Sequence, residues 1–478
     1  MDALYDNPPA AATRVGFVMA AVRSRIDARA IGRGAKLPSV RKFAEQLDVS
    51  KSTVVEAYDR LAAEGLVEAR RGSGFYVAAA APPLVLAAAP PSLNPGIDLL
   101  AIMRNALESR PDMLQPGAGW LPESWLPLDS VERALRAVSR GPASAKLRYD
   151  PPRGLESLRR VIAARLTERG APVDPAQIML TDSATHGLDL AARFFLSPGD
   201  CVVIDDPHYF NIVQLLDVHR AKIVLAPFLP DGPDLAALES VFAEHRPRLY
   251  ITVAGPHNPT GAALSPSHAH RALKLAERYD VVIVEDDIYC DLEPTPSPRL
   301  ASFDGYDRVV QVGGFSKTVS AALRTGYIVA RPDWAAALVD LKLVTSLGNS
   351  SLAANILHRV LTEGSYRRHL DALRPRLAAA IGLTSRRLKS LGVTPWIEPR
   401  GGMFLWAQLP DGLDAVEVAK AGLEENVVFA PGRAFSPSPQ WRDYMRFNVA
   451  LSAEPRVFES LDRAMKRAKS QRPNSRDG

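Results

Sequence analysis

The chain has 478 residues, 47% of them apolar, so its length predicts about two to four domains with sizeable cores. No apolar run approaches the roughly 20 residues that span a bilayer, and the first residues lack the charged and then apolar build of a signal peptide, so we expect a soluble protein without a membrane partner. The net charge of +5 is small for this length, so nucleic-acid binding would depend on a local basic patch.

Cysteine usage indicates the compartment. Cys201 and Cys290 are the only cysteines, and they do not have the spacing of metal ligands. We therefore expect no metal site, and a reducing compartment without disulfides, which is the cytoplasm.

Three helices are predicted near the N-terminus, each beginning after a residue that can cap it. The caps are Thr13, Ser39 and Ser50. The apolar positions that follow the helical period are Val15, Val18, Met19, Val22 and Ile26 in the first helix, Val40, Phe43, Ala44 and Leu47 in the second, and Val54, Tyr58 and Leu61 in the third. The short turn Asp48-Val49 between the last two helices is typical of a helix-turn-helix.

The third helix and the segment after it carry the polar and basic side chains of this region. Lys51, Ser52 and Thr53 lie on the exposed first turn of the helix, which in such modules reads base edges in the major groove. Residues 66–77 predict two short strands around a tip with Arg70, Arg71 and Gly72, and arginines there suit phosphates or the minor groove. The alternative is a small three-helix domain with an ordinary solvated basic face.

Four segments of this region form a known pattern: Leu37-Pro-Ser-Val-Arg-Lys-Phe-Ala-Glu-Gln-Leu47, Val49-Ser-Lys-Ser-Thr-Val54, Glu64-Gly-Leu-Val67 and Arg71-Gly-Ser-Gly74. Together they resemble the winged helix-turn-helix of GntR-type regulators. The resemblance covers about 65 residues, and we place this domain at 12–77. It implies that Arg41, Lys51, Thr53, Arg70 and Gly72 face DNA. Lys51 stands where arginine is commoner in the family, and Asp48 replaces the usual turn glycine.

A linker is predicted at 78–97. This segment is rich in Ala and Pro, carries almost no charge and has no helical or strand period. In an extended polyproline form of about 3.1 Å per residue, its length would bridge up to roughly 60 Å, enough to reach over a partner subunit.

Residues 98–470 alternate between helices and apolar strands. Helices are predicted at 154–169 and 235–244. The predicted strands are Met179-Leu180, Cys201–Ile204, Leu249–Val253, Val281–Val284 and the β-branched run at Val309, Val310 and Val312. This pattern predicts an α/β domain with a mostly parallel sheet, its large part at about 146–345. A smaller α+β part would comprise 98–145 and 346–470, with a hairpin-like run at Gly401–Trp406.

The strand at 309–312 is followed by two glycines and then by Ser316 and Lys317, with Arg324 further on. Open α/β sheets keep their ligands at this end of the strands. Desolvation lowers the pKa of an amine, and a neutral amine condenses with an aldehyde to a Schiff base, which is how pyridoxal phosphate is held in enzymes. Arg324 and Ser316 would then face the cofactor phosphate. The alternative is a surface lysine after a strand.

Four further strand ends carry polar residues that a pyridoxal phosphate site needs. Asp286 can keep the pyridine nitrogen protonated. Asn258, in the turn Asn258-Pro-Thr-Gly261, and Tyr289 can meet the phenolic oxygen. Ser183, Ala184 and Thr185 open a helix whose free amides suit a phosphate, and Tyr209 can stack on a flat ring. Each feature alone has an ordinary structural explanation, but their coincidence at five strand ends favours the cofactor site.

These motifs follow one another along the chain in the order Tyr149-Asp-Pro-Pro-Arg-Gly154, Asn258-Pro-Thr-Gly261, Asp286-x-x-Tyr289, Ser316-Lys317 and Arg324. This order resembles that of fold-type I aminotransferases of the aspartate aminotransferase class, and the resemblance spans residues 98–465. The resemblance implies that Lys317 forms the internal aldimine and that Arg324 binds the phosphate with Ser183, Thr185 and Ser316. Tyr149 would reach the phosphate from the neighbouring subunit of a homodimer. Arg446 would clamp the carboxylate of an amino acid, which a guanidinium does bidentately. Nothing matches the second, side-chain-recognising arginine of that class, and Ser183-Ala184 stands where glycine is frequent.

A GntR-type reader joined through a linker to an aminotransferase-like domain resembles the MocR family of regulators. We therefore expect a regulator that binds operator DNA and senses a small amino compound through aldimine exchange at Lys317. The first alternative is an active aminotransferase that carries a DNA-binding module. The second is a regulator whose large domain serves only as a dimerisation scaffold.

Overall fold

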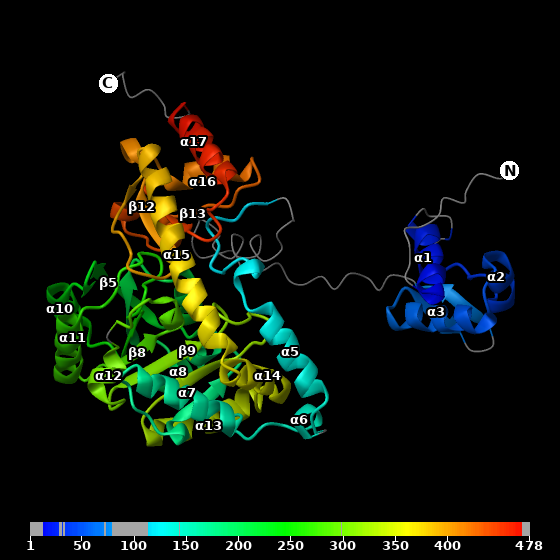
Figure 1. Ribbon diagram of the computed structural model, residues 1–478, viewed down its shortest axis with the longest axis horizontal. Coiled ribbons are helices and arrows are strands. Elements are labelled where there is room, and N and C mark those ends of the chain that lie inside the picture. The colour runs from blue at the N-terminus through cyan, green and yellow to red at the C-terminus, as the bar shows by residue number, and fades with distance from the viewer. Residues whose placement is uncertain are drawn as a thin grey trace. The chain divides into compact units, whose positions relative to one another are not determined.

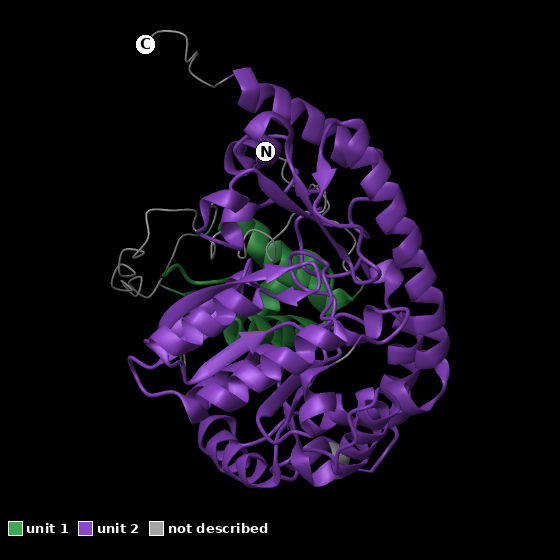
Figure 2. Ribbon diagram, turned by 90° about the vertical axis from the view of Figure 1, so that its left-hand side faces the viewer, with its two compact units in different colours: residues 1–93 green, residues 94–478 purple. Residues whose placement is uncertain are grey.

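The computed structural model describes residues 13–27, 31, 34–70, 73–78, 113–142, 144–297 and 299–470. The chain divides into two compact units, residues 1–93 and residues 94–478, drawn in two colours in Figure 2. The division lies within the segment predicted as a linker. Residues 79–97 of that segment, the adjoining 98–112, and Arg71 and Gly72 of the predicted wing tip lie outside the described residues.

The first unit is a winged helix-turn-helix. It consists of α1 (Arg14–Asp27), α2 (Val40–Leu47) and α3 (Lys51–Ala63), followed by the antiparallel pair β1 (Val67–Arg70) and β2 (Gly74–Val77). The three predicted caps are confirmed: Thr13, Ser39 and Ser50 accept the amides of Gly16, Lys42 and Thr53 at 3.1, 3.3 and 3.1 Å. The predicted apolar stripes meet in one core that includes Val18, Phe43, Val54, Tyr58 and Leu61. Asp48 adopts a left-handed conformation with φ +50°, which aspartate tolerates better than most residues and which explains why it can stand in place of a turn glycine.

The second unit is built on an eight-stranded sheet of order β3-β10-β9-β8-β7-β4-β5-β6 (Figure 1). The strands are β3 (Ile178–Thr181), β4 (Cys201–Asp206), β5 (Lys222–Leu229), β6 (Gly232–Pro233), β7 (Leu249–Thr252), β8 (Val282–Asp286), β9 (Val309–Gly314) and β10 (Gly326–Val329). Only β10 and β6 run antiparallel to their neighbours, so the predicted mostly parallel sheet is confirmed. The central strands are apolar on both faces because helices cover both faces.

A four-stranded antiparallel sheet of order β11-β12-β14-β13 forms the smaller part of this unit. Its strands are β11 (Thr394–Pro395), β12 (Phe404–Gln408), β13 (Ala430–Pro431) and β14 (Tyr444–Asn448). A hairpin-like run was expected at Gly401–Trp406; β12 begins only at Phe404, and it pairs antiparallel with the preceding strand β11 and with β14. Gly402, with φ +86°, lies in the bend before it.

Helices surround both sheets. They are α5 (Leu128–Ser139), α6 (Ser144–Leu147), α7 (Glu156–Glu168), α8 (Ala184–Phe195), α9 (Phe210–Val218), α10 (Leu235–His245), α11 (Pro266–Tyr279), α12 (Leu300–Asp304), α13 (Pro332–Ser346), α14 (Ser351–Thr362), α15 (Ser365–Ser390), α16 (Ala415–Leu423) and α17 (Pro455–Ser470). The long α15 packs on α14 at one end and on β11 and β12 at the other, so it joins the two sheets (Figure 1). Within the described ranges, no helix is long and apolar enough to cross a membrane.

Candidate functional site

A cavity of about 940 Å³ lies in the second unit and contains most of the residues predicted to bind a cofactor. We call it the Lys317 cavity. The predicted residues that line it are Ser183, Ala184, Thr185, Tyr209, Asn258, Asp286, Tyr289, Ser316, Lys317, Arg324 and Arg446. Tyr149 does not line it and is 83% exposed.

The sheet topology explains why residues so distant in sequence meet. β3, β4, β7, β8 and β9 are parallel, so their carboxyl ends reach the same edge of the sheet, and a site group follows each of them. β10 is antiparallel and pairs Gly326 with both Thr181 of β3 and Gly314 of β9. Arg324, just before β10, is therefore held between the start of α8 and the Ser316-Lys317 turn.

One end of the cavity is suited to an anion. We call the set Ser183, Ala184, Thr185, Ser316 and Arg324 the anion cradle. Ser183 caps α8, whose first amides have no partner within the helix. A Cβ on Gly326 would lie 2.5 Å from the Ser183 carbonyl carbon, so only glycine lets β10 approach the cradle this closely. No carboxylate of the described part of the chain pairs with Arg324, so its charge is available to a ligand.

The Lys317 amine is held in the interior of the cavity. Its Nζ donates a hydrogen bond to the Gly119 carbonyl at 2.8 Å. Burial, helped by the nearby positive charges of Arg446 and Arg324, lowers the pKa of Lys317 to about 8, against the opposing effect of Asp286. At pH 7 such an amine is neutral roughly 300-fold more often than an ordinary lysine with a pKa of 10.5, and it is therefore a better nucleophile.

Asp286 is a buried carboxyl group that lacks a strong cationic partner. Its Oδ1 accepts the Ile288 amide at 3.1 Å, and no arginine or lysine in the described ranges forms an ion pair with it. Burial raises the pKa of Asp286 to about 7, with a contribution from Asp287, while the Ile288 amide and Lys317 act in the opposite direction. A cationic ring nitrogen would supply the missing partner.

Asn258 and Tyr289 are joined to Arg446 by hydrogen bonds. The Asn258 amide nitrogen lies 3.4 Å from the Tyr289 hydroxyl, and its oxygen accepts Arg446 Nη1 at 2.7 Å. Burial raises the pKa of Tyr289 above its usual value and that of Tyr209 to about 12, so both hydroxyls remain protonated donors at neutral pH.

Arg446, on β14 of the smaller sheet, faces the cavity opposite the lysine. Its second terminal nitrogen donates to the Gly117 carbonyl at 2.6 Å, and its guanidinium carbon lies 4.3 and 4.6 Å from the ring centres of Phe404 and Phe435. Its Nε is buried without a partner among the described groups. Burial lowers the pKa of Arg446 to about 10, so the side chain remains charged at neutral pH.

The segment Gly117-Ala-Gly-Trp120, which lines the cavity, was not predicted from the sequence. Its carbonyl groups at Gly117 and Gly119 hold Arg446 and Lys317. The two closely spaced glycines were the available signal, because a Cβ on Gly117 would lie 2.6 Å from the Ala430 amide. Phe404 and Phe435, which sandwich Arg446, had no signal beyond their apolar character.

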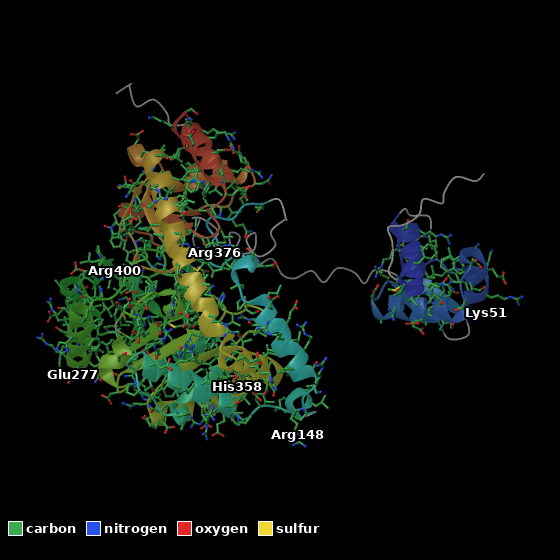
Figure 3. All side chains as sticks on the ribbon, viewed as in Figure 1. Lys51, Arg148, Glu277, His358, Arg376 and Arg400 are labelled. Atoms are coloured by element: carbon green, nitrogen blue, oxygen red, sulfur yellow. The ribbon has the colours of Figure 1, made fainter. Side chains whose placement is uncertain are left out.

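In the first unit, the predicted DNA-contacting residues lie on the exposed start of α3 and on the wing. The Ser50 hydroxyl lies 2.8 and 2.7 Å from those of Ser52 and Thr53, and Lys51, labelled in Figure 3, begins the helix. Arg41 pairs with Glu45 at 3.2 Å, and Arg70 pairs with Glu68 and lies 4.4 Å from the Tyr76 ring centre. Exposed ion pairs of this kind contribute about 0.2–1 kcal/mol to stability. A DNA phosphate can therefore replace the glutamate as the partner of either arginine.

Comparisons with known proteins match this architecture. Residues 121–459 match the family Aminotransferase class I and II, and residues 15–77 match Bacterial regulatory proteins, gntR family. The fold and the site therefore define an aminotransferase class I and II domain joined to a GntR domain. The uncharacterized HTH-type transcriptional regulator YdcR of Escherichia coli is 31% identical over 87% of this chain and 91% of its own length. The 2-aminoadipate transaminase of Thermus thermophilus is 29% identical over 75% of this chain and 90% of its own.

Among solved structures, the α-aminoadipate aminotransferase LysN of Thermus thermophilus, complexed with N-(5'-phosphopyridoxyl)-L-leucine, has a TM-score of 0.69. It is 28% identical, and the match covers 77% of this chain and 95% of that chain. The chain belongs to the MocR type of HTH transcriptional regulators. A GntR domain implies DNA binding, and an aminotransferase-like domain implies a small amino compound as its ligand.

Proposed function

We propose that this protein is a pyridoxal phosphate-dependent transcriptional regulator that binds operator DNA in the cytoplasm and senses a small amino compound at Lys317. The observation that carries the proposal is the cavity in which a buried lysine of lowered pKa lies between an anion cradle and a buried arginine. The same chain carries a winged helix-turn-helix, so a ligand signal and a DNA reader are joined in one molecule.

The residues of the cavity fit pyridoxal phosphate. The anion cradle would hold the phosphate, Asp286 would hold the ring nitrogen, and Asn258 with Tyr289 would meet the phenolic oxygen. Tyr209 would stack on the ring, and Lys317 would carry the cofactor on its amine. Bound there, pyridoxal phosphate supplies an aldehyde that condenses reversibly with amines. Arg446 would hold the carboxylate of the amino compound, because its Nε has no partner within the described part of the chain.

Ligand binding would act on the position of the smaller sheet. Arg446 belongs to β14 of that sheet, whereas Lys317 follows β9 of the larger one. A compound that engages both draws the two sheets together. It shifts the equilibrium only by its differential affinity for the closed and open states, and a factor of about 100 supplies roughly 2.7 kcal/mol.

A second candidate is an active aminotransferase that carries a DNA-binding module. It is favoured by the complete set of lysine, carboxylate, amide, tyrosine and arginine groups in the cavity and by the similarity to a 2-aminoadipate transaminase. The two candidates differ in turnover, since conversion of an effector to a keto acid would remove the signal.

We expect an amino compound to change operator affinity about 100-fold while being consumed slowly or not at all. The measurement is made on one preparation, comparing consumption of the amino donor with DNA binding over a range of salt. The Lys51→Ala variant serves as a control, because it lies outside the cavity and should weaken DNA binding without altering the response of the cofactor spectrum. Rapid multiple turnover with unchanged DNA binding would rule out the regulator and leave the aminotransferase.

We further propose that the second unit forms a homodimer in which Tyr149 reaches the neighbouring site. Large apolar side chains are exposed on α5, on and just after α6, and from the end of α13 to the start of α14, and both α5 and α6 pack on α14. This interface patch consists of Leu128, Leu135, Leu147, Tyr149, Val344, Leu347 and Leu352. Leu147 is 83% and Val344 is 87% exposed, which is unfavourable unless a partner covers them. Arg148, labelled in Figure 3, directly follows the last residue of α6, and Tyr149 is the next residue in the chain.

Sedimentation of the protein should show a dimer at micromolar concentration. The double substitution Leu147→Glu and Val344→Glu should weaken the dimer at least about 100-fold, because each buried carboxylate would lack a partner. Val218→Glu, which changes an exposed valine of α9 outside the patch, should leave the dimer intact. A wild-type monomer that retains the cofactor would contradict the dimer.

A further inference from the structure

Lys342 on α13 is buried, with 0% of its surface exposed, although it lies outside the Lys317 cavity. Its Nζ donates three hydrogen bonds: to the Pro152 carbonyl at 2.9 Å, to the Leu180 carbonyl at 2.9 Å and to Asn349 Oδ1 at 2.5 Å. An ammonium has three N–H groups, so its donors are saturated. A buried cation is tolerated only when it is fully bonded, so these three acceptors are held in a defined arrangement.

Two of the acceptors lead to the anion cradle. Leu180 is the third residue of β3, three positions before Ser183. Asn349 donates to Asp182 Oδ1 at 2.8 Å, and Asp182 immediately precedes Ser183. The amide of Asp182 also donates to His186 Nδ1 at 3.2 Å, within the first turn of α8. These bonds connect Lys342 to the end of β3 and, through Asn349, to the residue before the start of α8.

The third acceptor belongs to the segment that carries Tyr149. Pro152 lies three residues after Tyr149, and the next residue, Arg153, accepts the Leu180 amide through its carbonyl at 3.0 Å. Gly154, with φ +86°, packs so closely that a Cβ would lie 2.6 Å from Leu180 side-chain atoms. Asp150, adjacent to Tyr149, has a buried Oδ2 without a partner among the described groups, and burial raises the pKa of its carboxyl group while Ser351 and Lys342 oppose the shift.

We infer that Lys342 is a positioning residue that couples the anion cradle of its own chain to the Tyr149 segment, residues 149–154. In the proposed dimer this segment contacts the cofactor site of the partner subunit. The inference rests on the proposed dimer with pyridoxal phosphate bound. One ammonium bonds Leu180, near the cradle, and Pro152, near Tyr149, so its loss would disturb two sites of the dimer: the cradle of the same chain, and the partner's site through a displaced Tyr149.

Mixed dimers of one wild-type chain and one Lys342→Met chain, separated by different affinity tags, test this coupling. Methionine keeps the length and apolar stem of lysine but removes all three donors. The release of pyridoxal phosphate to an apo-enzyme trap is followed by absorbance. We expect the Lys342→Met homodimer to release the cofactor about tenfold faster, and both sites of the mixed dimer to be faster than wild type. Half of the cofactor leaving at the wild-type rate would overturn the coupling.

Asn349→Ala provides the matched comparison, because Asn349 bonds Asp182, next to the cradle, and among the described residues no hydrogen bond joins its side chain to the Tyr149 segment. The substitution removes one acceptor of Lys342 and leaves the acceptor at Pro152. Its mixed dimer should have one fast site and one wild-type site, and the same pattern for both variants would overturn the assignment. If Lys342→Met does not fold, Lys342→Gln, which keeps two donors, should give the two-site pattern with a smaller change. Failure of the proposed function is distinguishable, since the wild type would then bind no cofactor or sediment as a monomer.

Discussion

We expect replacement of Lys317 by alanine to abolish covalent attachment of pyridoxal phosphate while leaving the fold intact. The reason is that this amine alone lines the cavity: Lys317 is the only lysine among the described lining residues. Reduction with borohydride followed by mass spectrometry of the protein measures the attachment. The wild type should carry one cofactor per chain and the variant none.

Two comparisons sharpen this test. Lys274→Ala removes an exposed lysine of α11 and should leave attachment unchanged, and Asp286→Ala should weaken binding without preventing attachment. Because the pKa of Lys317 is about 8, the rate of attachment should rise about tenfold from pH 7 to pH 9 and level off, whereas an unperturbed lysine would still be gaining at pH 9. A covalent adduct on Lys317→Ala would show that another amine holds the cofactor.

We expect replacement of Arg446 by glutamine to lower the affinity for carboxylate-bearing amino compounds by about 100-fold or more. A charge-assisted pair in a buried site contributes about 2–5 kcal/mol on truncation, and every 1.4 kcal/mol is a factor of ten. Two aromatic rings flank the buried guanidinium of Arg446, and a loss of about 100-fold corresponds to roughly 2.8 kcal/mol, within this range. Titration of the holo-protein with amino acids, followed by the cofactor spectrum, measures the affinity.

The control for this substitution is Arg433→Gln, an exposed arginine in the same part of the second unit that does not line the cavity. It should bind amino acids like the wild type. A decarboxylated amine distinguishes a carboxylate-binding role of Arg446 from a general loss of structure. The amine has no carboxylate, so it should bind weakly and with the same affinity to the wild type and to Arg446→Gln. Equal loss for the amine and the amino acid would contradict a carboxylate-binding role.

The sequence by itself determined the elements and the order of the groups. The caps at Ser39 and Ser50 and the strand at Val309 were predictable because capping and apolar periodicity act between residues close in the chain. The composition of the cavity was predictable as well, since parallel strands place their carboxyl ends at one edge and a polar residue followed each strand. At Gly401–Trp406 the local pattern indicated a hairpin-like run but not the two partners of β12, of which β14 is distant in sequence.

Only the tertiary structure decided what holds these groups in place. Gly119, which accepts the Lys317 amine, is 198 positions away from it, and Gly117, which accepts Arg446, is 329 positions away. Lys342 joins Pro152 and Leu180 over 190 and 162 positions. A backbone carbonyl is present at every residue, so the sequence carries no mark of which one will face a buried cation. That choice follows from the packing of the whole unit, which brings a helix, a strand end and a loop to one point.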